Sequence, residues 1–134
     1  RYVAALINLA VGMETLALNE VPQKDAKPAI REAAGYLETA VRLDPLNALT
    51  HLDLAIALTY FPERRANAIE EFRQTLDLQP QNATAHDKLG GLLAENPATA
   101  SEGLDHLRAA QQLAPDAARA AKIAELNRQY NGHQ

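Results

Sequence analysis

The chain has 134 residues, of which 47% are hydrophobic and 4% aromatic, and its formal net charge is −4. This length suits one domain, and the acidic balance argues against binding a nucleic-acid backbone, which needs clustered Lys and Arg. The sequence contains no Cys, which excludes disulfides and Cys-ligated metals and leaves the redox compartment open.

The first predicted element is a helix over residues 2–19, whose apolar run is interrupted by Asn8 and Glu14. These two polar residues argue against a membrane span. The chain begins at Arg1, without Met and already in a helical pattern, so we expect a fragment of a longer protein. A polar stretch over residues 20–27 is expected to form a surface loop.

Six further helices are predicted from apolar periodicity and from residues that favour helix ends. Asn47, Asn82 and Asp116 are the expected N-caps, and Thr99 with Glu102 forms the pattern of a capping box. The predicted helices cover residues 26 or 28 to 43, 48–60, 65–78, 83–95, 100–113 and 117–130.

An internal repeat of 35 residues runs through the chain and is marked by Pro45, Pro80 and Pro115, each with a Leu two places earlier. Other residues recur at the same step: His51 with His86, Leu54 with Leu89, Leu58 with Leu93, and Phe72 with Leu107. A period in this range predicts stacked helical hairpins. The first hairpin matches at an offset of 45 residues, so about ten extra residues fall at the predicted loop over residues 20–27.

Inside each central unit, Leu54-Ala55 or Leu89-Gly90 lies on the first helix, and Phe72 or Leu107 lies among small residues on the second. This pattern, with its terminal Pro, resembles the tetratricopeptide repeat, and the resemblance covers residues 6–115. It implies an all-α fold, a right-handed α-solenoid of antiparallel helical hairpins. We expect one domain with hairpins over residues 2–44, 47–79 and 82–114 and a capping helix over residues 117–131.

The resemblance also implies a binding face, because the first helix of each hairpin lines the concave side of such a solenoid. The helix over residues 48–60 has a second apolar stripe beside its packing stripe, which packing within one hairpin does not require. Its apolar side chains are expected to supply affinity, and its charges orientation. The expected partner-binding residues are Ile7, Val11, Leu49, Leu52, Asp53, Ile56, Tyr60, Asp87 and Lys88.

One subclass of the tetratricopeptide family binds the acidic carboxyl-terminal tails of chaperones through a clamp of Lys, Asn and Arg. The matching positions here are Ile7, Val11, Asp53, Thr84 and Lys88, of which only Lys88 has the right type. Asp53 would repel a carboxylate, so we do not expect a clamp for chaperone tails.

No constellation in the sequence predicts catalysis, a cofactor or a metal. Ser, His and Asp form no nucleophile pattern, and the glycines are scattered rather than gathered in a phosphate-binding loop. His51 and His86 occupy equivalent positions, and no carboxylate or Cys lies at ligand spacing on both of their helices. We therefore expect both His to fill structural positions in a non-catalytic protein.

Three functional classes remain. The first is a protein-interaction module or scaffold whose concave groove holds a partner peptide or helix. The second is a structural or self-associating segment of a larger protein, which would form homo-oligomers. The third is RNA binding, since pentatricopeptide repeats are also hairpins of 35 residues, but the face here is apolar with Lys88 as its one basic residue. We prefer the first class and expect no nucleic-acid partner; the sequence does not indicate a compartment.

Overall fold

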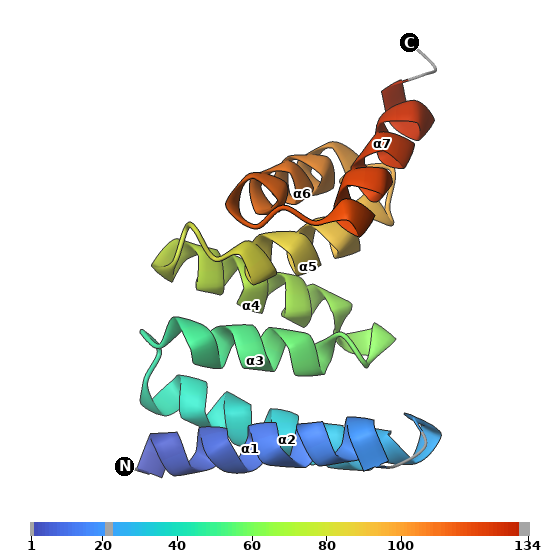
Figure 1. Cartoon of the computed structure of the whole chain (residues 1–134). Coiled ribbons are helices and arrows are strands. Elements are labelled where there is room, and N and C mark those ends of the chain that lie inside the picture. Colours follow the sequence, from blue (N-terminus) through green and yellow to red (C-terminus); the bar gives the residue numbers. More distant parts are fainter. Residues whose placement is uncertain (1, 21–22, 132–134) are drawn as a thin grey trace. The chain divides into compact units, whose positions relative to one another are not determined.

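The computed structural model describes the backbone of residues 2–20 and 23–131 and the side chains of residues 3–13 and 26–130. These residues form helices joined by short turns, and none of them lies in a strand (Figure 1). The helices are α1 (Tyr2–Glu20), α2 (Gln23–Leu43), α3 (Ala48–Leu58), the short 3-10 helix η1 (Pro62–Arg64), α4 (Arg65–Leu78), α5 (Ala83–Ala94), α6 (Ala100–Leu113) and α7 (Ala117–Asn131).

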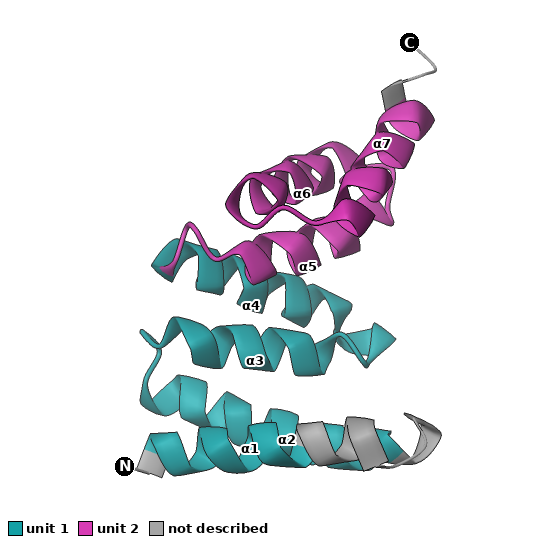
Figure 2. Ribbon diagram, viewed as in Figure 1, with its two compact units in different colours: residues 1–78 teal, residues 79–134 magenta. Residues whose placement is uncertain are grey.

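The chain divides into two compact units, residues 1–78 and residues 79–134 (Figure 2). In the first unit α1 packs on α2 and α3 packs on α4, and in the second α5 packs on α6. Each pair is an antiparallel hairpin, because a short turn reverses the chain between its helices. The predicted fold class, an all-α repeat of helical hairpins, is confirmed.

The first hairpin differs from the prediction of a polar loop over residues 20–27. Helix α1 continues to Glu20 and α2 already begins at Gln23, with Pro28 inside the helix, while residues 21–22 lie outside the described part. The extra residues of this hairpin are therefore used mainly to lengthen its helices. Pro28 is the sixth residue of α2, just beyond the four amides that the start of a helix leaves unbonded, so it removes one backbone hydrogen bond near the start of the helix.

The predicted caps are confirmed at three helices and fail at one. The side chains of Asn47 and Asn82 accept hydrogen bonds from the backbone amides of Thr50 and Ala85, and Asp116 accepts one from the amide of Arg119. Thr99 does not form the expected capping box. Its hydroxyl donates to the carbonyl of Leu93 at 2.7 Å and so ties the start of α6 to the end of α5.

Small residues recur where the two helices of a hairpin would meet. Ala10 and Ala33 in the first hairpin are fully buried, and so are Ala55 and Ala68 in the second. In the third hairpin the corresponding residues are Gly90 and Gly103, both buried. A Cβ atom added to Gly90 would lie 2.7 Å from the carbonyl oxygen of Gly103, so α5 and α6 approach each other at backbone distance.

His51 joins two turns of the first unit. Its Nε2 lies 2.8 Å from the carbonyl oxygen of Pro45, and its Nδ1 lies 2.5 Å from Oε2 of Glu71 on α4. A carbonyl oxygen only accepts, so Nε2 carries a hydrogen and donates it to Pro45. The contact of Nδ1 with Glu71 links α3 to α4 through this buried ring.

The second unit repeats this arrangement 35 residues later with one substitution. Nε2 of His86 donates to the carbonyl of Pro80 at 2.8 Å, and its Nδ1 lies 2.9 Å from Nδ1 of His106. His106 stands where the first unit has Glu71. Since His86 already donates through Nε2, its Nδ1 accepts and His106 donates. The expectation that His51 and His86 are structural agrees with these contacts.

Replacing His51 with Leu should lower the free energy of unfolding by about 2 kcal/mol, because the Glu71 carboxylate and the Pro45 carbonyl would lose their partner. Urea denaturation measures this change. The control is Glu63→Gln, which weakens the ion pair with Arg31 on the open surface, keeps Arg31 over the Phe61 ring, and should leave the midpoint nearly unchanged. An unchanged midpoint for His51→Leu would mean that water replaces both contacts.

Candidate functional site

The first unit presents part of the expected concave face to solvent. Leu49 on α3 is 56% exposed and Val11 on α1 is 36% exposed, and Ile7, Ile56 and Tyr60 are partly exposed. Leu52 differs from the expectation of an open groove residue, because it is only 8% exposed and belongs to the core. Leu49 and Val11 are therefore the apolar residues of this face that a partner could reach most easily.

The packing of α7 shows that the side of a first helix can have a second role. Ile123, Leu126 and Tyr130 stand two periods after Asp53, Ile56 and Tyr60. In α7 these residues pack on the preceding hairpin, in a cluster formed by Ala94, Leu104, Leu107, Leu126, Ile123 and Tyr130. The same stripe of a first helix thus serves packing between neighbouring hairpins. A second apolar stripe in the sequence is not by itself evidence of a ligand groove.

Asp53 lies on this face of α3, and it is half-buried. Among the described residues no hydrogen bond or ion pair reaches its carboxylate. Burial raises the pKa of Asp53 above its ordinary value, and no charge among the described side chains opposes this shift. A carboxylate that loses hydration without gaining a partner destabilises the folded state.

Asp53→Asn should therefore stabilise the chain slightly at neutral pH. Since the pKa is raised in the folded state, the stability contributed by protonation of Asp53 is present in acid and is lost as the pH rises through the raised pKa. The gain in Tm should be clear at about pH 7 and absent below the ordinary pKa of about 4. Thermal melting at both pH values measures it. A variant less stable than wild type at neutral pH would show that Asp53 has a stabilising partner.

The two expected site residues of the second unit have different surroundings. Lys88 is exposed. Asp87 accepts a 2.7 Å hydrogen bond from Nε of Arg119 on α7, whose guanidinium also donates to the carbonyls of Ala110 and Ala114 at the end of α6. Arg119 thus closes α7 onto the hairpin of α5 and α6, and Asp87 is engaged within its own unit. The sequence pattern did not predict this contact.

An exposed apolar turn lies between α2 and α3, and it was not predicted from the sequence. Leu43, Leu46 and Leu49 are 53%, 77% and 56% exposed. The Asn47 cap and the bond from His51 to Pro45 hold this turn in place. A comparison of the repeats could have indicated this exposed apolar turn. The positions equivalent to Leu46 and Leu49 are polar in the later units: Gln81 and Thr84, then Asp116 and Arg119.

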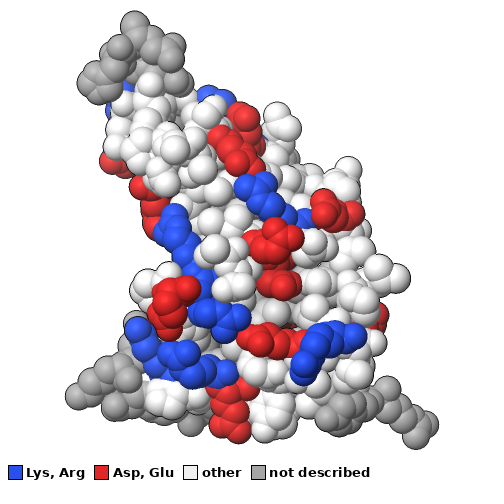
Figure 3. Space-filling model, turned by 180° about the vertical axis from the view of Figure 1, so that it is seen from behind, with Lys and Arg blue, Asp and Glu red and all other residues white. Residues whose placement is uncertain are grey.

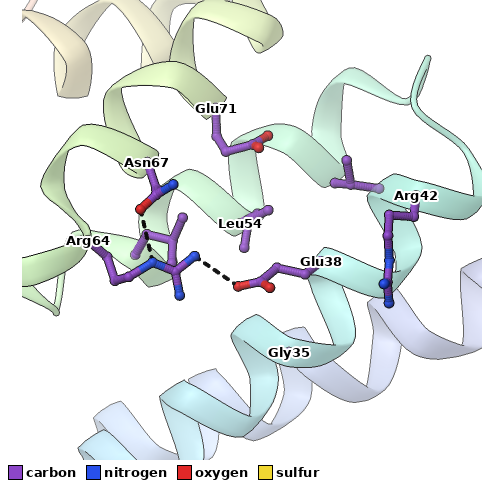
Figure 4. Close-up of a pocket in the computed structure, with 9 residues that line it drawn as sticks. Gly35, Glu38, Arg42, Leu54, Arg64, Asn67 and Glu71 are labelled. Atoms are coloured by element: carbon purple, nitrogen blue, oxygen red, sulfur yellow. Dashed lines mark hydrogen bonds and ion pairs between the residues drawn. The ribbon is translucent and has the colours of Figure 1, made fainter.

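A pocket of about 330 Å³ opens in the first unit between α2, α3 and α4 (Figure 4). The buried Leu54 and Leu58 are among its lining residues, together with the charged Glu38, Arg42, Arg64 and Glu71. Three of these charged groups are already engaged within the unit: Arg64 donates to Glu38 and to Asn67, both at 3.1 Å, and Glu71 binds His51. These contacts join η1 to α2 and α3 to α4, so the pocket is better explained by packing than by a ligand.

The charges on the surface are mixed in sign. Figure 3 shows both Lys and Arg and Asp and Glu on the face that it draws, with acidic side chains beside the basic ones. Among the described residues, no group of three or more His, Asp and Glu is placed to hold a metal ion. Within the same residues, no helix combines the length and hydrophobicity needed to cross a membrane.

No protein-family model matches the sequence, and no curated protein sequence matches it significantly. Solved structures do match. The type III secretion translocator chaperone SycD from Yersinia enterocolitica aligns in an alternative-dimer crystal structure with a TM-score of 0.65 and 13% identity, over 92% of this chain and 92% of that chain. A second SycD structure gives 0.59 and 14%, over 93% and 90%. The chain has a helical-repeat fold.

The N-terminal domain of stress-induced protein-1 from C. elegans has the same fold. Its TM-score is 0.61 at 19% identity, and the alignment covers 92% of this chain and 98% of that domain. At these identities the similarity concerns the fold alone. It agrees with the hairpin architecture predicted from the 35-residue period, and it leaves the binding residues to be argued from this chain.

Proposed function

We propose that this chain is a non-catalytic protein-interaction module of the tetratricopeptide type, which holds a partner peptide or helix on the face formed by the first helices of its hairpins. The observation that supports it best is the exposure of Leu49 and Val11, two large apolar side chains on α3 and α1. Exposed apolar side chains on the face of a helical repeat are suited to anchor a partner.

Two further observations support a protein partner. Two of the solved structures that share this fold are titled as a chaperone, SycD, and proteins of that kind act on other proteins. The interspersed charges in Figure 3 suit neither an RNA nor a DNA backbone. In this proposal Ile7, Ile56 and Tyr60 extend the apolar contact of the first unit, and Asp53 supplies its charge. Lys88 is a separate exposed charge on the second unit. Leu52 contributes through the core that supports the face.

The experiment measures binding of synthetic amphipathic peptides by fluorescence anisotropy. Each peptide is helical, with one Leu a turn before and one a turn after a central residue that is Lys, Met or Glu. At least one peptide should bind the wild-type chain, and the double variant Val11→Glu with Leu49→Glu should weaken binding at least tenfold while circular dichroism stays unchanged. Such a loss corresponds to about 1.4 kcal/mol or more.

The matched control is Leu113→Glu, which adds a charge at another exposed Leu, in the second unit at the end of α6. Binding by this control should equal that of wild type. Failure of every peptide to bind, or equal binding by the double variant, would contradict the proposed face. Leu52→Arg should instead unfold the chain, because Leu52 is buried.

Self-association is the second candidate function, and the apolar turn favours it. Leu43, Leu46 and Leu49 are exposed together, and one SycD crystal structure is titled as an alternative dimer. In this alternative the turn would contact a second copy of the chain. Light scattering after size exclusion tests it: a dimer that Leu46→Ser converts to a monomer supports self-association, and a wild-type monomer at high concentration contradicts it.

A further inference from the structure

The partly buried carboxylates provide the starting observation. Among the described residues they are Glu38, Asp53, Glu71, Asp87 and Glu102. Four of them face a basic group: Glu38 faces Arg64 at 3.1 Å, Glu71 faces His51 at 2.5 Å, Asp87 faces Arg119 at 2.7 Å, and Glu102 faces His106 at 3.7 Å. Asp53 alone in this set has no such contact.

The neighbouring helix does not supply the missing cation. Helix α1 contacts α3, and residues 3–13 of α1 include no charged side chain. Burial raises the pKa of Asp53, and among the side chains that the structure describes no basic group of α2 or α4 lowers it. The described residues of the unit therefore leave this half-buried carboxylate without a cation.

The second unit shows how such a carboxylate is satisfied. The Arg119 guanidinium on α7 reaches Asp87 from outside the hairpin and is 11% exposed when bound. At Asp53 no described side chain of the first unit supplies an equivalent cation, so a partner could supply it. Leu49 lies one turn before Asp53 and Ile56 one turn after it on the same side of α3. Apolar side chains on both sides of such a cation would therefore match this part of α3.

We infer that Asp53 is the acceptor for a Lys or Arg side chain of the partner, and that this basic residue is flanked by apolar residues which contact Leu49 and Ile56. The inference rests on the proposed function and specifies the chemistry of its partner. A charge-assisted hydrogen bond in a half-dehydrated setting favours the basic segment over an acidic one of the same shape. It also offsets the desolvation of Asp53. The chain would therefore distinguish partners by their charge as well as by their apolar surface.

The same three peptides test this inference. The peptide with central Lys should bind the wild-type chain at least tenfold more tightly than the peptide with central Glu, with Met between them. Asp53→Asn should reduce the preference for Lys, and Asp53→Lys should reverse it so that the Glu peptide binds best. Asp77→Asn is the control, because it removes one exposed carboxylate of the same unit and changes the net charge equally.

The outcomes separate this inference from the proposed function. Equal binding of all three peptides that is still abolished by Val11→Glu with Leu49→Glu would refute the role of Asp53 and keep the interaction face. A preference for Lys that survives Asp53→Lys, or that Asp77→Asn removes as well, would place the selecting charge elsewhere and also refute it. Absence of binding by every peptide contradicts both.

Discussion

Replacing Gly90 with Leu is expected to lower the free energy of unfolding of the second unit by about 3 kcal/mol. A Cβ atom at Gly90 would lie 2.7 Å from the carbonyl oxygen of Gly103 and 2.8 Å from Cγ of Leu107. The first of these neighbours is backbone and cannot rotate away, so α5 and α6 must separate. The separation also loosens the contacts of Leu89, Leu93 and Leu107, which are buried in the hairpin.

Urea denaturation followed by circular dichroism measures this change, and the adjacent glycine provides the control. A Cβ at Gly91 would meet only Nζ of Lys122, at 3.8 Å, which is ordinary contact. Gly91→Ala should therefore stabilise the helix by about 0.5–1 kcal/mol, because Ala has the higher helix propensity. Opposite effects at two neighbouring glycines would identify the crossing point. Equal effects would show that Gly90 does not lie at the crossing.

The sequence was sufficient for the hairpin architecture because the period, the caps and the small residues depend on local and repeated features. The 35-residue step aligns Ala55 with Gly90, and the structure buries both. The caps at Asn47 and Asn82 follow from one side chain and an amide three residues later. Such features need no knowledge of which hairpins touch.

The first hairpin shows where a pattern of polar residues and prolines fails. The stretch over residues 20–27 has loop composition, but α2 begins at Gln23 and includes Pro28. Composition cannot distinguish a loop from the solvated first turns of a long helix. Proline is disfavoured inside a helix, yet α2 accommodates Pro28 as its sixth residue, where one backbone hydrogen bond is missing.

The candidate face was harder to predict, because two physical roles give a first helix the same sequence. A stripe that packs on a preceding hairpin is apolar, and so is a stripe that binds a partner. Leu52 and Leu49 are both Leu on the same helix, yet one is 8% exposed and the other 56%. Only the packed structure separates them. Likewise, Asp53 and Asp87 are both acidic residues on first helices. Only the structure shows that Asp87 accepts a hydrogen bond from Arg119.

Ending the chain after Asp116 is expected to destabilise the second unit and to cause aggregation. Removal of α7 uncovers Ala94, Leu104 and Leu107, which form one cluster with Leu126. It also removes Arg119, so the Asp87 carboxylate and the carbonyls of Ala110 and Ala114 lose their donors. An exposed apolar face at the end of a helical repeat is an aggregation hazard.

Point variants on α7 distinguish the contribution of its packed side chains from the contribution of the helix as a whole. Leu126→Ala removes the buried side chain and should cost about 2–3 kcal/mol, whereas Lys122→Ala on the exposed side of the same helix should change stability little. Light scattering of the truncated chain and urea denaturation of the two variants measure these effects. A truncated chain that remains monomeric with an unchanged urea midpoint would show that α5 and α6 bury their own core. Loss of stability in Leu126→Ala but not in Lys122→Ala would establish that α7 stabilises the unit through its packed face rather than through helix content.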